Sequence, residues 1–173
     1  EVPILRFPEP LTLFYDRAPW TDEIIVGRLR VLSALYNRRE GGSRDSGSRD
    51  LRSTVSGSTN SGLIVVSSAR ALMQRTLPLH QYRLSIRHVR LGQMLDLDRT
   101  LRRWAGLGYE PVSVVEAPGQ FSHRGGIIDI YPPDDELPVR IELWGNEIDS
   151  IRRFDPGTQR SRDRVEEVTI APA

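Results

Sequence analysis

Cysteine and lysine are both absent from the 173-residue sequence, so all 24 of its basic residues are arginine. Without cysteine the chain has no thiol nucleophile, no disulfide and no zinc site built on thiolates. Without lysine it has no phosphate-binding loop of the Walker type and no side-chain amine for Schiff-base chemistry. These two absences exclude several common enzyme classes before any motif is considered.

Long hydrophobic runs are also missing. No stretch approaches the roughly 18 apolar residues that a membrane-spanning helix needs. No secretory leader is recognisable, and no initiator Met precedes Glu1. With 38% hydrophobic residues, the chain is suited to one sizeable domain or two small ones. We therefore expect a cytoplasmic chain that is a piece of a longer protein.

The net charge of +1 conceals an uneven distribution. Residues 63–109 carry eight arginines against two acidic residues, whereas residues 110–173 carry seven against thirteen. One interpretation is a basic surface for nucleic acid. The other is a protein whose two layers carry complementary charge, and we favour it because charge asymmetry alone is a weak indicator.

A helix followed by a polar stretch is predicted in the first third of the chain. Thr21 or Asp22 supplies an N-cap, and apolar residues recur at helical spacing up to Tyr36. Residues 38–62 are mostly Ser, Gly and Arg, which bury too little surface to offset the entropy of ordering. We expect a mobile, solvated loop there. Contact of this loop with nucleic acid is not favoured, because three acidic residues lie among its five arginines and no aromatic is present to stack on a base.

The next segments complete an α/β pattern. The apolar run GLIVVSS at 62–68 predicts a strand buried on both faces. Ser67 or Ser68 caps the helix that follows, and Pro78 stops it. A helix, a strand and a helix in this order are typical of an α/β unit. Residues 82–87 then predict a further strand.

The last part of the chain predicts a helix and then an antiparallel meander. Asp96 or Asp98 opens a helix over 96–107, with Leu97, Leu101, Trp104 and Ala105 facing inward and Arg99, Arg102 and Arg103 outward. Consecutive strands follow at 111–116, 120–132, 138–144, 147–154 and 165–172. The resulting fold class is the end of an α/β unit followed by a small α+β domain, with an antiparallel sheet packed on a helix and a boundary near residue 86.

Glycines supply the turn signals within this meander. Gly145-Asn146 is a two-residue hairpin signal. Gly125 and Gly126, in the strand expected at 120–132, are expected to permit a bulge or close packing against a neighbour.

The strand at 138–144, PVRIELW, has an unusual outward face. Its alternation places Val139, Ile141 and Leu143 on the core side, and the opposite side carries Arg140, Glu142 and Trp144. Arginine and tryptophan are enriched at the energetic centres of protein interfaces. Two interpretations stay open on this evidence, namely a partner-binding face and a face covered by a third layer.

Motifs for catalysis are weak. His80, His88 and His123 have no metal-ligand spacing, and no GxSxG nucleophile motif is present. Across a Gly145-Asn146 turn, Glu142 is expected to face Asp149, and such a carboxylate pair can act as acid and base. We do not favour this use because an open sheet face offers no pocket.

Two longer segments carry a resemblance. Residues 116–133, EAPGQFSHRGGIIDIYPP, and residues 138–161, PVRIELWGNEIDSIRRFDPGTQRS, resemble the segment shared by the bacterial transcription-repair coupling factor (Mfd) family and the excision-repair helicase UvrB. Residues 12–35 and 67–78 resemble the coupling factors specifically, and the aromatic-rich hairpin of UvrB has no counterpart here.

The resemblance implies a domain organisation and a site. Residues 1–85 are expected to be the end of a degenerate helicase-like α/β subdomain, and residues 86–173 a domain that binds UvrA, the damage-recognition ATPase. The family's partner-binding positions fall on Arg124, Arg140, Glu142 and Trp144. Two positions depart from the family pattern: Trp144 stands where Phe is usual, and Ser122 where UvrB tends to have a second Arg.

The resemblance also implies a function. The fragment is expected to be a non-catalytic module that recruits UvrA to stalled transcription sites in nucleotide excision repair. It is expected to bind no cofactor, with ATP and Mg²⁺ used only by motor domains of the full-length protein. Further partners implied are an intramolecular carboxy-terminal domain, and RNA polymerase and DNA through domains absent here, with no membrane. The alternative is a nucleic-acid-binding module using the basic 63–109 segment and the Arg-rich loop.

Overall fold

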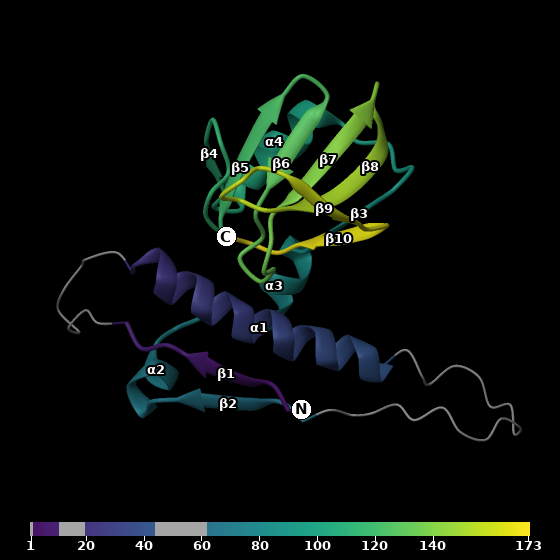
Figure 1. Cartoon of the computed structure of the whole chain (residues 1–173). Helices are drawn as coiled ribbons and strands as arrows, with labels where there is room; N and C mark the ends of the chain where they lie inside the picture. The colour runs from purple at the N-terminus through teal and green to yellow at the C-terminus, as the bar shows by residue number, and fades with distance from the viewer. Residues whose placement is uncertain (1, 11–19, 44–61) are drawn as a thin grey trace, which may run out of the picture. The chain divides into compact units, whose positions relative to one another are not determined.

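The structure, a computed structural model, describes residues 2–10, 20–43 and 62–173 (Figure 1). It divides into two compact units, Glu1–Thr76 and Leu77–Ala173. Each unit combines β-sheet with few helices, which is compatible with the α/β character predicted from the sequence.

The first unit contains a parallel strand pair. Strand β1 (Ile4–Phe7) pairs with β2 (Ile64–Ser67) in register from Ile4↔Ile64 to Phe7↔Ser67. Helix α1 (Asp22–Ser43) lies between the two strands in the sequence, and α2 (Ala69–Met73) follows β2. The predicted Ser68 cap is confirmed, because its side chain accepts a hydrogen bond from the backbone N–H of Ala71.

A buried arginine organises the small core of this unit. That core is formed by Phe7, Val31 and Ala71. The guanidinium of Arg28 lies 4.0 Å from the ring centroid of Phe7, and it donates to the carbonyls of Pro8 and Ala71 at 3.1 and 3.2 Å. Burial lowers the pKa of Arg28 from its usual value.

Three predictions for this unit need correction. Helix α1 continues to Ser43, so residues 38–43 are helical, as the high helix propensities of Arg and Glu allow. Residues 44–61 of the predicted loop lie outside the described residues. Strand β2 is not buried on both faces: Ile64, Val65 and Val66 are exposed, because β1 is its only strand neighbour within the described part of the chain. Helix α2 ends at Met73, well before Pro78.

The second unit is built on a six-stranded sheet of order β4-β5-β6-β7-β8-β9. All neighbours are antiparallel except β4 and β5, which are parallel. A second, two-stranded sheet pairs β10 with β3, and two helices complete the unit. The elements are α3 (Leu79–Ser85), β3 (Arg87–Arg90), α4 (Leu97–Gly106), β4 (Glu110–Pro111), β5 (Gln120–Arg124), β6 (Ile127–Ile130), β7 (Val139–Trp144), β8 (Glu147–Phe154), β9 (Ser161–Arg164) and β10 (Glu167–Ile170).

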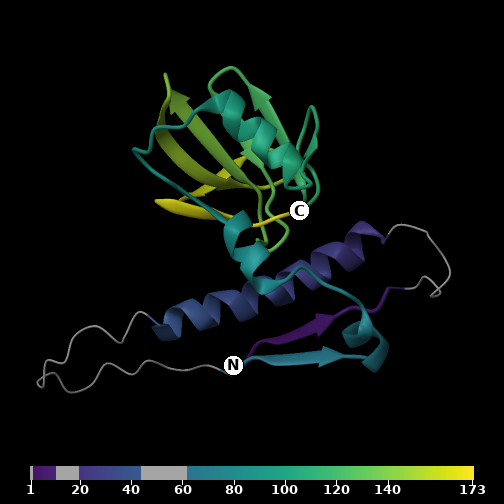
Figure 2. The same ribbon diagram turned by 180° about the vertical axis from the view of Figure 1, so that it is seen from behind.

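Helix α4 packs on one face of the large sheet, as Figure 2 shows. The predicted N-cap is confirmed, because the Asp96 carboxylate accepts from the backbone N–H of Arg99. Trp104 is buried and meets Phe121 edge-on, with ring centroids 6.1 Å apart. Ala105, predicted to face inward, is exposed. The core under α4 consists of Val89, Leu95, Trp104, Tyr109, Phe121, Ile128, Ile130, Val139, Ile141, Ile148, Ile151, Val168 and Ile170.

Several local predictions for this unit are wrong. Residues 82–85 belong to α3, because Tyr82 and Ile86, four residues apart, are both buried while Leu84 between them is exposed. The predicted strand at 120–132 is a hairpin: β5 and β6 pair across a two-residue turn at Gly125-Gly126, where Gly125 has φ 60°. Gly126 does pack closely, as predicted, against the backbone of Leu143.

The edges of the meander also differ from the prediction. Of the strand predicted at 111–116 only Pro111 is in a strand, and β9 was not predicted at all. Strand β10 leaves the meander and pairs with β3, with Glu167 opposite Arg90. The predicted turn at Gly145-Asn146 is confirmed, since Trp144 pairs with Glu147.

Candidate protein-interaction face

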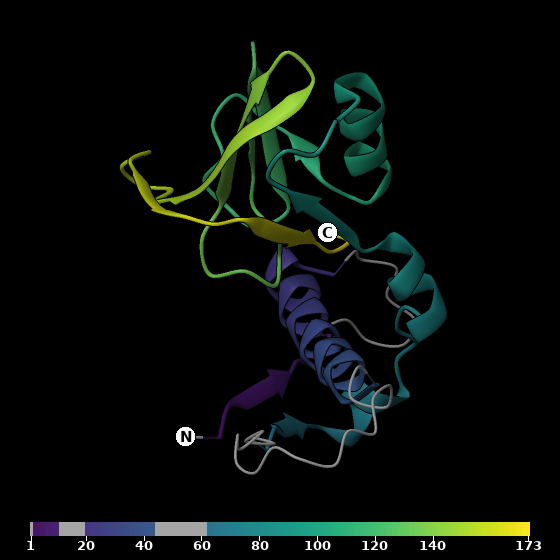
Figure 3. The same cartoon turned by 90° about the vertical axis from the view of Figure 1, so that its right-hand side faces the viewer.

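The face of the large sheet that α4 does not cover carries most of the polar side chains. In the view of Figure 3, α4 lies on one side of this sheet. Residues paired directly across strands lie on the same face, so the register defines two rows on the other side. One row is Arg124, Ile127, Glu142 and Ser150, and the next is Ser122, Asp129, Arg140, Arg152 and Arg164. We call these two rows and Trp144 the polar face.

Arg140 forms a buried ion pair at the centre of the polar face. Its Nε donates to Asp129 Oδ1 at 2.7 Å and its Nη2 to Asp129 Oδ2 at 2.9 Å. The side chain of Arg140 is 18% exposed and that of Asp129 only 3%. The hydrogen bonds to Asp129 raise the pKa of Arg140 above its usual value. Two parallel bonds fix the plane of the guanidinium, so this arginine is held rigidly.

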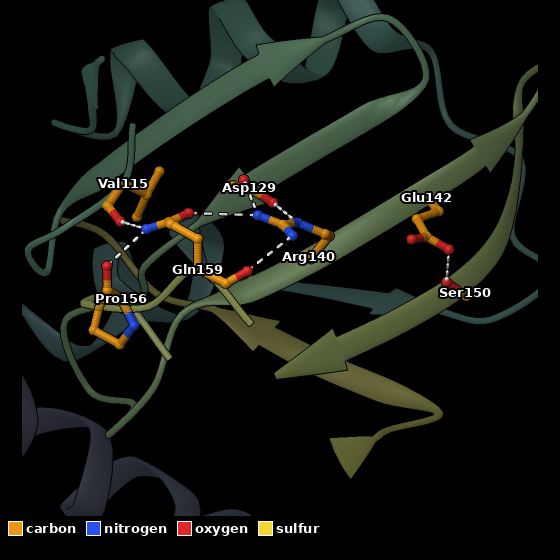
Figure 4. A network of polar contacts seen from close by, with 7 residues as sticks. All are labelled: Val115, Asp129, Arg140, Glu142, Ser150, Pro156 and Gln159. Carbon is orange, nitrogen blue, oxygen red and sulfur yellow. Dashed lines mark hydrogen bonds and ion pairs between the residues drawn. The ribbon is translucent and has the colours of Figure 1, made fainter. Parts of the chain in front are cut away.

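Gln159 also accepts hydrogen bonds from the guanidinium of Arg140 (Figure 4). Its backbone carbonyl and Oε1 accept from Arg140 at 3.4 and 3.5 Å, and its Nε2 donates to the carbonyls of Val115 and Pro156 at 3.1 and 2.7 Å. Gln159 has φ 59°, the only positive φ of a non-glycine residue in the described ranges. The Arg140 guanidinium also lies 4.6 Å from the ring centroid of Phe154. Sequence reasoning missed Gln159, because nothing in its local pattern predicts a positive φ.

Glu142 is half-buried and already paired. Ser150 donates its hydroxyl to Glu142 Oε2 at 2.5 Å, and Arg152 Nη2 lies 3.6 Å from the same oxygen. The predicted pairing of Glu142 with Asp149 is wrong, because the register shifts beside Glu142 and places Ser150 opposite it. The carboxylate pair considered for catalysis is therefore not formed.

The remaining predicted residues lie at the exposed end of the polar face. The side chain of Trp144 is 83% exposed, and Arg124 is exposed at the end of β5 with no ion pair or hydrogen bond from its guanidinium to the described residues. Ile127 pairs with both Arg124 and Glu142 and is 42% exposed. Sequence reasoning missed Ile127, although two adjacent isoleucines in a strand must point to opposite faces.

This arrangement is suited to binding a partner. Within residues 2–10, 20–43 and 62–173, no group of three His, Cys, Asp or Glu residues is placed to hold a metal ion. The ion pairs of Arg140 and Glu142 stiffen the centre of the face. Beside them an exposed aromatic, an exposed aliphatic and an arginine that has no partner among the described residues form a small patch, which we call the anchor patch (Trp144, Ile127 and Arg124). Such a combination is typical of interface hot spots.

Comparison with known families identifies the second unit. The family model described as "UvrB interaction domain" matches residues 88–173, which include the large sheet, α4, β10 and most of β3. Residues 88–173 form a UvrB interaction domain. All four predicted site residues lie within it.

The chain is similar to transcription-repair-coupling factors, which confirms the resemblance seen in the sequence. The protein of Bacillus subtilis (strain 168) is 42% identical over 110 residues, 64% of this chain and 9% of that protein. That of Staphylococcus aureus (strain USA300) is 54% identical over 85 residues, 49% of this chain and 7% of that protein. The chain thus spans less than a tenth of the length of these relatives. No helix in the described ranges is long and apolar enough to cross a membrane.

Proposed function

We propose that the polar face of the UvrB interaction domain binds UvrA, and that this chain is the module through which a coupling factor recruits UvrA to stalled transcription sites. The observation that carries the proposal is the exposed Trp144, beside Ile127 and Arg124 on a face whose central charges are paired as Arg140–Asp129 and Glu142–Arg152. An aromatic with 83% of its surface in water gains most from docking against a partner.

The four residues named from the sequence have different roles in this proposal. Trp144 and Arg124 make direct contacts, with Ile127 between them and Arg124 pairing with a carboxylate of the partner. Arg140 and Glu142 contribute their exposed edges and keep the central strands rigid, because each is already paired within the domain. A rigid face loses less conformational entropy on binding than a flexible one.

We extend the proposal to the rest of the chain. The first unit is the end of a degenerate helicase-like subdomain; the parallel β1–β2 pair and the absence of lysine from the chain support this assignment. The fragment has no ATPase activity, since ATP and Mg²⁺ are used by motor domains elsewhere in the coupling factor. It acts in the cytoplasm, where the carboxy-terminal domain of the full-length protein is a further partner, and RNA polymerase and DNA are bound by other domains.

The test is a titration of this chain against UvrA of the same organism. Trp144→Ala and Arg124→Ala are expected to weaken binding, Trp144→Ala by ~2 kcal/mol or more, as for an interface hot spot. Trp144→Phe is expected to retain most of the affinity, because it keeps an aromatic anchor. Both positions are exposed, so neither variant should unfold the domain.

The matched control is Arg102→Ala. Arg102 is exposed on α4, on the other side of the sheet, and its removal is expected to leave the affinity for UvrA unchanged. Equal affinities for the parent chain, Trp144→Ala and Arg124→Ala would contradict the residue assignment while leaving UvrA as the partner. Failure to bind UvrA, with binding to duplex DNA that weakens steeply with salt, would favour the nucleic-acid alternative instead.

A further inference from the structure

A second surface lies on the helix side of the UvrB interaction domain. A groove of about 280 Å³ runs between β3 and α4. Strand β3 contributes Arg87 and His88 to its lining, and α4 contributes Arg99 and Arg103. Because α4 covers the sheet face opposite the polar face, the groove is separate from the anchor patch. We call it the arginine groove.

The charges of the arginine groove are mostly uncompensated. The guanidinium groups of Arg99 and Arg103 form no hydrogen bond or ion pair with the described residues, and Arg87 donates only to the carbonyl of its neighbour Ile86. One carboxylate, that of Asp96, lies in the lining, where it caps α4. Three arginines therefore face a single acidic residue in this groove.

Other groups near His88 are already paired with each other. The imidazole of His88 lies 2.9 Å from Glu167, whose carboxylate also accepts from Arg90. Thr169 lies 3.2 Å from the same imidazole nitrogen. Because Glu167 already pairs with His88 and Arg90, it does not neutralise the arginines on α4.

Arg99 lies where α4 itself does not favour a cation, whereas Arg103 lies in the last turn, where the helix dipole does. Arg99 and Arg103 are four residues apart, and like charges at this spacing destabilise a helix. Arg99 is also the third residue of α4, near the positive end of the helix dipole. A bound anion would relieve both the repulsion between Arg99 and Arg103 and the unfavourable position of Arg99.

The floor of the groove is apolar and lacks an accessible aromatic ring. Val89, Leu95 and Trp104 form part of the lining and are buried, and Met94 is exposed beside them. Trp104 is packed edge-on against Phe121, so it cannot stack on a nucleotide base. An apolar floor between arginines fits a polypeptide that alternates acidic and aliphatic side chains better than it fits a nucleic-acid backbone.

The sheet beside the groove has room for such a segment. Strand β3 pairs with β10, and its other edge pairs with no strand in the described part of the chain, although Gln93 bonds to the backbone of Arg90 at one end of that edge. Extended peptides commonly bind by adding to a free strand edge, with alternate side chains held in pockets. We propose that the arginine groove binds an extended acidic segment of a partner protein, with its carboxylates on Arg99 and Arg103 and its aliphatic side chains on the apolar floor.

The experiment uses the whole chain and a short fluorescein-labelled peptide that alternates Glu with Leu. Fluorescence anisotropy at low salt is expected to show saturable binding. The same peptide with Gln in place of Glu is expected to bind at least about tenfold more weakly, since charge-assisted hydrogen bonds to arginine are lost. The double variant Arg99→Ala, Arg103→Ala is expected to weaken binding of the Glu peptide by a similar factor.

Two controls separate the groove from the rest of the surface. Arg102→Ala removes the same charge from the same helix outside the groove lining and is expected to change the affinity less than about twofold. Trp144→Ala removes the anchor patch and is expected to leave the affinity for the peptide unchanged. Circular dichroism of each variant verifies that α4 is retained.

Three results would overturn the proposal. The first is the absence of saturable binding by the Glu peptide. The second is an equal loss of affinity in Arg102→Ala or Trp144→Ala, which would mean diffuse charge attraction or binding at the polar face. The third is binding of duplex DNA that the double variant abolishes while the peptide does not bind, which would assign the groove to nucleic acid.

Discussion

Arg140 has two properties that usually occur separately, because it belongs to a surface proposed to bind a partner and is also fixed inside the domain. It donates two hydrogen bonds to Asp129, which is buried, and contacts Gln159 and Phe154. Loss of a buried ion-pair partner leaves an uncompensated charge, which is destabilising. A binding defect in an Arg140 variant therefore cannot be interpreted without a measurement of its stability.

We predict that Arg140→Ala lowers the free energy of unfolding by about 3 kcal/mol, because it leaves the Asp129 carboxylate buried without its cation. Urea denaturation followed by tryptophan fluorescence measures this change. The matched control is Arg164→Ala, in the same row of the polar face but exposed, with an expected change within about 0.5 kcal/mol. A loss in Arg140→Ala as small as that in the control would mean that the ion pair contributes little.

Asp135 makes stability depend on pH. Burial, with a smaller contribution from Asp134, raises the pKa of Asp135 to about 6, although Arg153 opposes the shift and Glu136 adds to it. Because the folded state holds this proton more tightly than the unfolded state does, the contribution of Asp135 to stability is fully present below about pH 4. It is lost as the pH rises through about 6.

We therefore predict that Asp135→Asn is more stable than the parent chain at pH 7.5 or so, by roughly 1 kcal/mol after allowance for its partial exposure. The difference should disappear near pH 4. Thermal unfolding across this pH range measures it, with Glu136→Gln, an exposed change in the same turn, as the control. A stability difference that does not vary with pH would exclude Asp135 as its source.

At the scale of single elements, the β5–β6 hairpin shows how a glycine fixes the position of a neighbouring strand. A Cβ built on Gly126 would lie 2.9 Å from the carbonyl oxygen of Leu143. The backbone N–H of Leu143 donates to the carbonyl of Gly126 at 2.7 Å. The turn therefore packs directly against β7, next to Ile127 and Trp144. The geometry of the anchor patch depends on this contact.

We predict that Gly126→Ala lowers the free energy of unfolding by about 1–2 kcal/mol, because backbone atoms must move to admit the methyl group. Gly106→Ala is the matched control: a Cβ there meets nothing within 4 Å, and alanine is a better helix former than glycine. The control is expected to be neutral or slightly stabilising. Chemical denaturation of both variants checks the contrast, and equal effects would contradict it.

The elements also show which structural features the sequence can predict. Strands β7 and β8 and helix α4 were predicted because the alternation of PVRIELW, the Gly145-Asn146 turn and the Asp96 cap are local signals. Helix α3 was not, since Tyr82, Leu84 and Ile86 alternate like a strand, and only packing around Tyr82 and Ile86 decides for the helix. The pairing of β10 with β3 joins residues far apart in sequence, which no local pattern specifies.

The whole molecule combines a unit with a small core and a unit with a large one. The family match covers residues 88–173, and the core under α4 is built entirely from residues after Leu77. We predict that residues 77–173, produced alone, unfold in one cooperative transition, as expected of a domain with its own core. Thermal unfolding monitored by near-ultraviolet circular dichroism tests this. A broad transition without a baseline would mean that the domain needs the preceding unit.

The candidate site could be predicted in part at this scale. The alternation of residues 138–144 placed Arg140, Glu142 and Trp144 on one face, and the register of the sheet places Arg124 there too. Sequence alone could not show that Arg140 and Glu142 are already paired, because Asp129, Ser150 and Gln159 come from other strands and turns. Their role as partner-binding residues stays a prediction.

The three tryptophans supply a set of intrinsic fluorophores that report on separate events. Trp20 lies against the Arg28 guanidinium in the first unit, Trp104 is enclosed in the core of the second, and Trp144 is almost fully in water. Quenching by acrylamide should therefore be strong for Trp144 and weak for Trp104. In the Trp20→Phe background, a blue shift of the Trp144 emission with the Trp104 emission unchanged would reveal that a partner occupies the anchor patch. No extrinsic dye would be needed.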